Sequence, residues 1–235
     1  MLEVDDLHAY YGKSHILHGV SLRVDEGEIV SLLGRNGVGR STTIKAVMGD
    51  VQAAGSVRFR NEEICGLPPY VIARKGLGYV PENRDIFPTL TVRQNLLLGV
   101  KNTRRAGRWS MDDMFDMFPA LRQRADNPGG VLSGGEQQML TICRTLMGDP
   151  HLIMVDEPTS GMSRSETEHV VGLIRQVTAG KTLLMVEHDM SVVFDLADRI
   201  AVLVYGEIIA HDTPERIRAS AAVQEAYLGV PQGVA

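Results

Sequence analysis

The sequence has few cysteines and lacks the patterns that depend on them. Cys65 and Cys143 are the only two, and neither belongs to a CxxC pair or a Cys/His cluster, so neither a disulfide framework nor a zinc site is expected. No apolar run approaches the ~18 residues that span a bilayer. We therefore expect the chain to be cytoplasmic, with any attachment to a membrane made through another protein.

A long basic stretch is also absent. The formal net charge is −5 and 23% of the residues are charged, which is typical of an ordinary soluble surface. Nucleic acid is therefore not an expected partner. The 235 residues suffice for one large α/β domain, or for a core domain with a smaller inserted lobe, and no further domain is expected.

The first part of the chain has the patterns of strands and a glycine-rich turn. Apolar residues alternate over residues 2–24, which predicts antiparallel β structure. Residues 27–34 form a short apolar strand that leads into glycines and then into a helix beginning near Ser41. A hairpin is predicted over residues 55–64. A strand, a glycine-rich loop and a helix in this order are the setting that a phosphate-binding loop requires.

The remainder alternates helices with apolar strands. An amphipathic helix precedes Gly99, Ser110 caps another helix, and a third runs through residues 140–147. Residues 151–158 and 181–189 form apolar strands that end in acidic residues, as expected for buried parallel strands with polar chemistry at their carboxyl ends. A hairpin over residues 200–212 and one C-terminal helix are predicted to close the chain.

The glycine-rich loop is the first candidate site. Its glycines let successive N–H groups point at a triphosphate, and the helix that follows adds its positive N-terminal end. Ser41 is placed to bind Mg²⁺ and Thr42 to contact phosphate. The candidate nucleotide contacts in this loop are Gly34, Asn36, Gly37, Gly39, Arg40, Ser41 and Thr42.

Two carboxylates, Asp156 and Glu157, end one of the apolar strands. Two acids capping a sheet edge would need no special role. With a phosphate loop on the same sheet, however, Asp156 can hold Mg²⁺ while Glu157 polarises an attacking water, a division of labour that phosphoryl transfer needs.

The segment LSGGEQQ, residues 132–138, is the most specific motif of the sequence. By itself it predicts a helix N-terminus with a Ser cap and exposed amides. Between a phosphate loop and the Asp156–Glu157 pair, it makes the chain resemble the ATP-binding subunits of ABC transporters over nearly its whole length. The resemblance implies one α/β domain over residues 1–235. It would have a P-loop NTPase core with a mainly parallel sheet, an N-terminal antiparallel β part and a small helical subdomain inserted at approximately residues 92–150.

Further roles follow from the resemblance alone. Tyr11 matches the aromatic residue that stacks on adenine, and Glu82 stands where most of the family has a Gln that links the γ-phosphate and metal region to the membrane subunit. His188 matches the histidine that contacts the γ-phosphate and orients Glu157. Ser133 and Gly135 match the residues that complete the nucleotide site of a second ATPase subunit, and the loop 160–163 matches one that crosses the dimer interface.

Within the family, the segments 79–99 and 129–140 look most like the ATPases of importers for branched-chain amino acids, with amide and urea importers close behind. This likeness implies ATP and Mg²⁺ as cofactors. It also implies transmembrane permease subunits and a second ATPase subunit as partners, with a periplasmic-type binding protein acting indirectly. The chain would then lie at the cytoplasmic face of the membrane.

Arg40 departs from the family, which has a Lys at this position of the loop. A planar guanidinium is bulkier than a compact ammonium and presents its donors in a rigid fork. Loss of the charge-assisted contacts of the Lys would cost about 1–3 kcal/mol, or roughly ten- to a hundredfold in affinity. One hypothesis is an ATPase with reduced activity that works beside a second subunit with an ordinary loop. The alternatives are a regulatory nucleotide-binding subunit without efficient hydrolysis and, ranked below both, an ABC ATPase with no role in transport.

Overall fold

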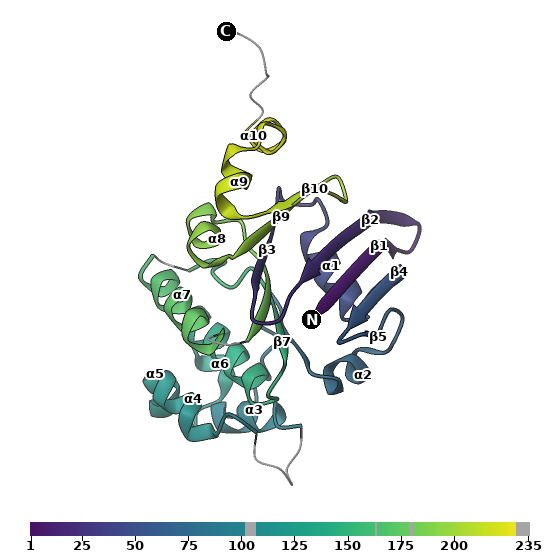
Figure 1. The fold of residues 1–235 in the computed structure, drawn as a ribbon. Helices are drawn as coiled ribbons and strands as arrows, with labels where there is room; N and C mark the ends of the chain where they lie inside the picture. Colours follow the sequence, from purple (N-terminus) through teal and green to yellow (C-terminus); the bar gives the residue numbers. More distant parts are fainter. Residues whose placement is uncertain (102–106, 163, 179–180, 229–235) are drawn as a thin grey trace.

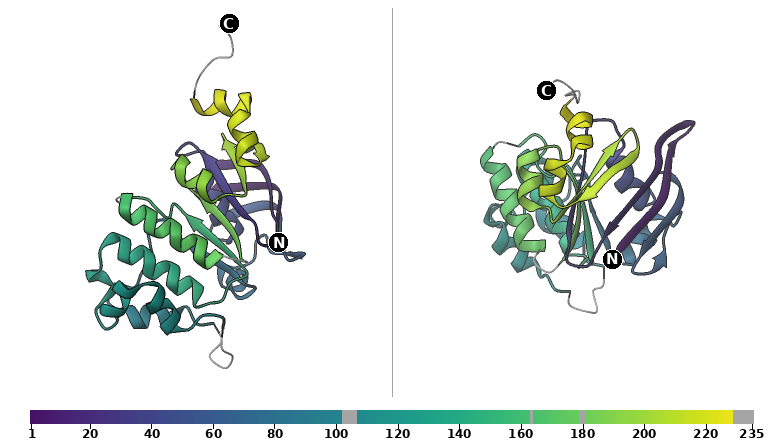
Figure 2. Two further views of the ribbon diagram at one scale, coloured as in Figure 1. Left: turned by 60° about the vertical axis from the view of Figure 1, so that its left-hand side comes forward. Right: turned by 45° about the horizontal axis from the view of Figure 1, so that its top comes forward.

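The structure is a computed structural model that describes residues 1–101, 107–162, 164–178 and 181–228. Within these residues the longer strands form two sheets. One has four strands in the order β2-β1-β4-β5, and the other has six in the order β10-β9-β3-β8-β7-β6. Figure 1 shows the two sheets beside each other with α1 between them. Figure 2 shows the helices drawn in teal and green on the opposite face of the second sheet.

The first sheet is antiparallel and comes from the N-terminal part of the chain. Its strands are β1 (Leu2–Tyr11), β2 (Ser14–Val24), β4 (Gln52–Phe59) and β5 (Glu62–Glu63). Leu2 and Val4 of β1 are buried while Glu3 and Asp5 are exposed. This alternation, read in the sequence as antiparallel β structure, arises because only one face of the sheet meets the core.

The second sheet is parallel except for its edge strand β10. Its strands are β3 (Ile29–Gly34), β6 (Leu77–Val80), β7 (Leu152–Asp156), β8 (Thr182–Val186), β9 (Arg199–Val204) and β10 (Glu207–Asp212). Every residue of β7 and β8 is buried, as expected for strands covered on both faces. Because parallel neighbours end at the same edge, the residues that follow β3, β7 and β8 gather there.

Helices cover both faces of the parallel sheet. They are α1 (Arg40–Val47), α2 (Pro69–Arg74), α3 (Val92–Leu98), α4 (Met111–Met117), α5 (Pro119–Gln123), α6 (Gly134–Leu146), α7 (Arg164–Thr178), α8 (Met190–Leu196), α9 (Pro214–Ala219) and α10 (Ala221–Leu228). A 3₁₀ turn, Gly129–Val131, precedes α6. Among the described residues, no helix has both the length and the apolar character needed to cross a bilayer.

Each face of the parallel sheet has its own apolar core. On one face α1 packs against both sheets, and Ile44, Leu32 and Leu7 belong to the same cluster of buried side chains. On the opposite face a second cluster joins β7 and β8 to the helices α3 to α8. Helices α3, α4, α5 and α6 fall within the range predicted for a helical subdomain, whose boundaries stay a prediction.

Local sequence signals fix several helix starts. The side chains of Thr91, Ser110 and Ser133 each accept a hydrogen bond from the backbone N–H three residues later. The side chain at that later position in turn accepts a hydrogen bond from the backbone N–H of the cap residue. The predicted caps at Ser110 and Ser133 are therefore confirmed, and the helix predicted through residues 140–147 begins at Gly134, directly after the signature serine.

Helix α1 begins at Arg40, with Gly39 as its N-cap, which confirms the predicted start near Ser41. One boundary prediction needs correction. The single predicted C-terminal helix is two, since Ser220 is extended (φ −75°, ψ 115°) and its hydroxyl and carbonyl cap the start of α10. Helices α2, α5, α7 and α8 were not predicted from the sequence patterns, although parallel pairing of β7 and β8 requires a crossover such as α7.

Candidate nucleotide-binding site

The loop between β3 and α1 has the backbone geometry of an anion site. Gly37 and Gly39 have φ angles of 82° and 110°, conformations that residues with a Cβ rarely adopt. Gly39 is the N-cap of α1 and supplies no side chain to the first turn. The N–H groups of that turn therefore remain available to a ligand at the positive end of the helix.

A cavity of about 270 Å³ lies over this loop. It is lined by Asn36, Gly37, Gly39, Arg40, Ser41, Thr42, Glu82 and Glu157. Gly34 lies behind it at the end of β3, where an added Cβ would come within 2.7 Å of the Leu203 carbonyl oxygen. The fold thus brings most of the predicted loop residues together with two acids that are distant in the sequence.

Arg40 is turned toward protein groups. It is only 5% exposed, and its Nη2 donates to Glu157 Oε1 at 2.7 Å and to Asn36 Oδ1 at 2.8 Å. Its Nη1 donates to the Glu187 carbonyl at 3.1 Å. The residue predicted to contact phosphate therefore forms an ion pair with the residue predicted to polarise water.

Ser41 and Asp156 lie beside this pair, with Ser41 Oγ donating to Asp156 Oδ1 at 2.8 Å. Burial raises the pKa of Asp156, the Ser41 hydrogen bond opposes this, and the charge of Glu82 adds to it. Hydroxyl and carboxylate oxygens are ligands that Mg²⁺ prefers. Among the described residues, no cluster of three or more His, Cys, Asp or Glu side chains with the arrangement of a metal site is found.

Glu157 and His188 come from the ends of neighbouring strands. Glu157 has a φ of 46°, an uncommon angle for a residue with a Cβ that costs about 1–3 kcal/mol, and its N–H donates to the Val186 carbonyl at 2.9 Å. His188 Nδ1 lies 3.3 Å from Glu157 Oε2. One carboxylate thus contacts both Arg40 and His188.

Glu187 is a buried acid that was not identified from the sequence. Its side chain is 0% exposed, and its Oε1 accepts hydrogen bonds from Thr159 Oγ1 and from the N–H groups of His188 and Asp189. Its Oε2 has no partner among the described residues. The only sequence signal is an acid at the end of an apolar strand, which does not distinguish a buried position from an exposed one.

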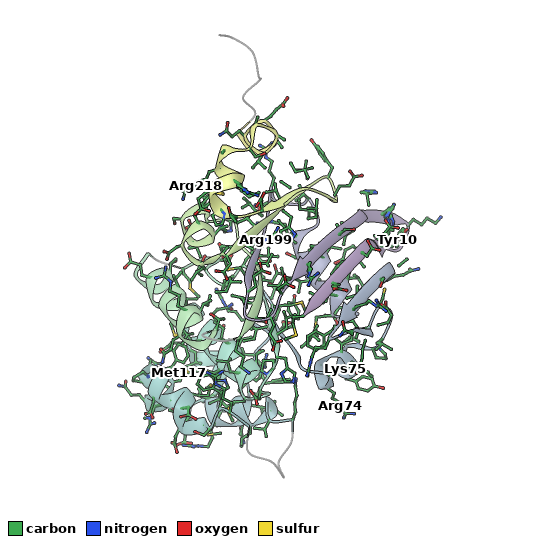
Figure 3. The ribbon with its side chains drawn as sticks, viewed as in Figure 1. Tyr10, Arg74, Lys75, Met117, Arg199 and Arg218 are labelled. Carbon is green, nitrogen blue, oxygen red and sulfur yellow. The ribbon has the colours of Figure 1, made fainter. Side chains whose placement is uncertain are left out.

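Tyr11, Ser133 and Gly135 do not line this cavity. Tyr11 is 46% exposed at the end of β1, whereas the adjacent Tyr10 stacks on His15 with 4.5 Å between ring centroids. Figure 3 shows Tyr10 on this hairpin, at the side of the molecule away from α4. Ser133 is engaged in its capping box, and Ser163 of the predicted interface loop lies outside the described residues.

A family profile described as "ABC transporter" matches residues 17–160. The chain belongs to the ABC transporter family. A second profile, described as "Branched-chain amino acid ATP-binding cassette transporter", matches residues 207–231 of this ABC subunit. The high-affinity branched-chain amino acid transport ATP-binding protein BraG of Pseudomonas aeruginosa is 42% identical over 97% of this chain and 100% of its own length. The lipopolysaccharide export system ATP-binding protein LptB of Haemophilus influenzae is 34% identical over 97% of each chain.

Solved structures agree with the fold. A nucleotide-free ATP-binding cassette from an ABC transporter has a TM-score of 0.82 at 28% identity, covering 98% of this chain and 99% of its own. A cassette in its ADP conformation has a TM-score of 0.81 at 28% identity, with the same coverage. The predicted fold class and the predicted resemblance to branched-chain amino-acid transport ATPases are confirmed.

Proposed function

We propose that this ABC subunit binds and hydrolyses Mg-ATP and couples both steps to the uptake of branched-chain or other amino acids. One observation carries the proposal: beside the phosphate loop, Glu157 contacts both Arg40 and His188, and a hydrogen bond joins the neighbouring residues Ser41 and Asp156. The proposed class of solute comes from the names of the relatives. The site itself does not indicate it, because the transported molecule does not contact this subunit.

Each residue has a proposed role. The loop amides, Asn36 and Thr42 contact the phosphates, while Ser41, Asp156 and Glu82 would hold Mg²⁺, which would neutralise phosphate charge when bound. Tyr11, which is exposed, stacks on adenine. The signature residues Ser133 and Gly135 complete the site of a second ATPase subunit.

Glu157 acts on the attacking water. Its carboxylate accepts a proton while the water oxygen bonds to the γ-phosphorus and the bond from that phosphorus to the bridging oxygen of ADP breaks. His188, 3.3 Å from Glu157, orients the carboxylate and contacts the γ-phosphate.

Transmembrane permease subunits and a second ATPase subunit are the proposed direct partners, and a periplasmic-type binding protein acts through the permease. The proposed location is the cytoplasmic face of the membrane. This rests on the likeness to transport ATP-binding proteins over almost the whole chain and on the C-terminal match at residues 207–231.

Replacing the proposed base tests the enzymatic role. Glu157→Gln should lower ATP turnover by about 10²–10⁴-fold, because general-base catalysis typically contributes that much, while leaving ATP bound. Turnover and retained nucleotide are measured on the subunit copurified with its permease, with Glu207→Gln on the exposed face of β10 as the control. Unchanged turnover after Glu157→Gln contradicts the mechanism.

A regulatory role is the second candidate, and the Arg40–Glu157 ion pair favours it. The guanidinium occupies Glu157 Oε1 at 2.7 Å, so this oxygen is not free to contact an attacking water. A purified homodimer should then hydrolyse ATP more slowly than its Arg40→Lys version. Equal rates contradict reduced activity. If nucleotide binds to the unsubstituted chain without any turnover, the regulatory role replaces the enzymatic one.

A further inference from the structure

The contacts of Arg40 point to a control built into the phosphate site. We propose that Arg40 is a latch for which Glu157 and the phosphates of a nucleotide compete. While the guanidinium is bound to Glu157, it is not available to phosphate. When it binds phosphate, its hydrogen bond to Glu157 is broken. The inference rests on the proposed function, because it requires that this cavity bind a nucleotide.

The hydrogen bonds of Arg40 favour an exchange of partners at Nη2. Both hydrogens of Arg40 Nη2 are used, one by Glu157 Oε1 at 2.7 Å and one by Asn36 Oδ1 at 2.8 Å. Nη1 donates one of its two hydrogens to the Glu187 carbonyl at 3.1 Å, so three of the five guanidinium hydrogens bind protein acceptors. Arg40 and Glu157 both line the cavity, so an entering phosphate meets them together. It can gain Nη2 only by displacing one of its two acceptors.

The charge of the cavity strengthens this competition. Among its described lining residues, Arg40 carries the positive charge, while Glu82 and Glu157 are acidic. With Glu157 paired to Arg40, the charge that remains is negative and opposes a phosphate. The side chains of Arg40 and Glu157 are only 5% and 13% exposed, so water screens their attraction weakly.

The same exchange would prepare Glu157 for catalysis. Its Oε1 faces Arg40, while its Oε2 lies 3.3 Å from His188 Nδ1. When phosphate takes the guanidinium, Oε1 becomes free to accept a proton, and Oε2 keeps its contact with His188. Arg40 is in this sense a positioning residue, which frees the base only when the site is occupied.

A double-mutant cycle on ADP affinity tests the latch. The dissociation constant is measured by calorimetry on the full chain for the unsubstituted protein, Glu157→Gln, Arg40→Met and the double variant. ADP is used because it cannot be hydrolysed at the γ-position. We expect Glu157→Gln to tighten ADP binding about tenfold when Arg40 is present, because ADP then no longer competes with a carboxylate for the guanidinium. In the Arg40→Met background the change should be less than about twofold.

The Arg35→Met variant is the matched control, because Arg35 lies in the same loop but is exposed. In that background Glu157→Gln should still tighten binding about tenfold. Arg40→Gln repeats the cycle if Arg40→Met does not fold. A merely structural ion pair would lower the melting temperature in Glu157→Gln without changing ADP affinity.

Two results separate the latch from the proposed function. Equal tightening by Glu157→Gln whether Arg40 is present or replaced overturns the latch, because the effect would then be simple removal of a negative charge near phosphate. A folded, unsubstituted chain that binds neither ADP nor ATP overturns the proposed function, and the latch with it.

Discussion

Replacing Gly39 by alanine should destabilise the subunit by about 2–5 kcal/mol, and two separate costs make up this value. The backbone of Gly39 has a φ of 110°, and holding an L-residue in a left-handed conformation costs roughly 1–2 kcal/mol. The new Cβ would also lie 2.6 Å from Leu17 Cδ2, and overpacking of this kind typically costs about 1–3 kcal/mol.

A second glycine separates these costs. Gly27 has a φ of 76°, and an added Cβ there meets nothing within 4 Å, so Gly27→Ala carries only the backbone cost. The free energy of unfolding of both variants is measured in urea, with the m-value checked for constancy. The energetic cost of the contact with Leu17 is then the difference between the losses of unfolding free energy in Gly39→Ala and Gly27→Ala.

The reasoning fails if the two variants unfold within about 0.5 kcal/mol of each other, since independent surface changes already scatter by that much. A shift of the loop also displaces the N–H groups at the start of α1. We therefore expect Gly39→Ala to lose ADP affinity and Gly27→Ala to retain it.

Two further predictions concern stability away from the site. Gly172 lies inside α7, with no heavy atom within 4 Å of an added Cβ, so Gly172→Ala should raise the free energy of unfolding by about 0.5–1 kcal/mol, and a decrease in urea denaturation contradicts this. Burial lowers the pKa values of His151 and His211, so the unfolded chain binds protons that the folded chain resists. Stability should therefore be complete above about pH 6.5 and decrease as the pH falls below it, and His211→Asn should flatten a plot of unfolding free energy from pH 7.5 to 5.5.

Much of the fold was predictable because its signals are local. Alternating apolar residues identified β1 and β2, and short apolar runs identified β3, β7 and β8. The hydroxyl of Ser110 selects a helix start through a contact three residues away. The break between α9 and α10 at Ser220 was not predicted. The apolar pattern of the C-terminal residues does not show where the backbone becomes extended.

Residue types and their spacing predicted the site from the sequence. The role of each residue in it stays a prediction. The glycines of the loop, the paired acids and the signature are each contiguous in the sequence, so the chemistry they favour can be inferred without a fold. The burial of Glu187 could not be inferred in this way, since it depends on Thr159 and on the backbone that packs around it.

The sequence by itself determined the family, the phosphate loop and the unusual arginine within it. Only the tertiary structure decided what that arginine contacts. Strand β8 lies between β3 and β7. This strand order, which no local sequence pattern encodes, sets the distance between the end of β3 and the end of β7. Arg40 and Glu157 are 117 positions apart, yet a hydrogen bond of 2.7 Å joins them. That contact joins the ends of two different strands. The effect of Arg40 on the site therefore depends on strand order and burial as much as on the replacement of a lysine.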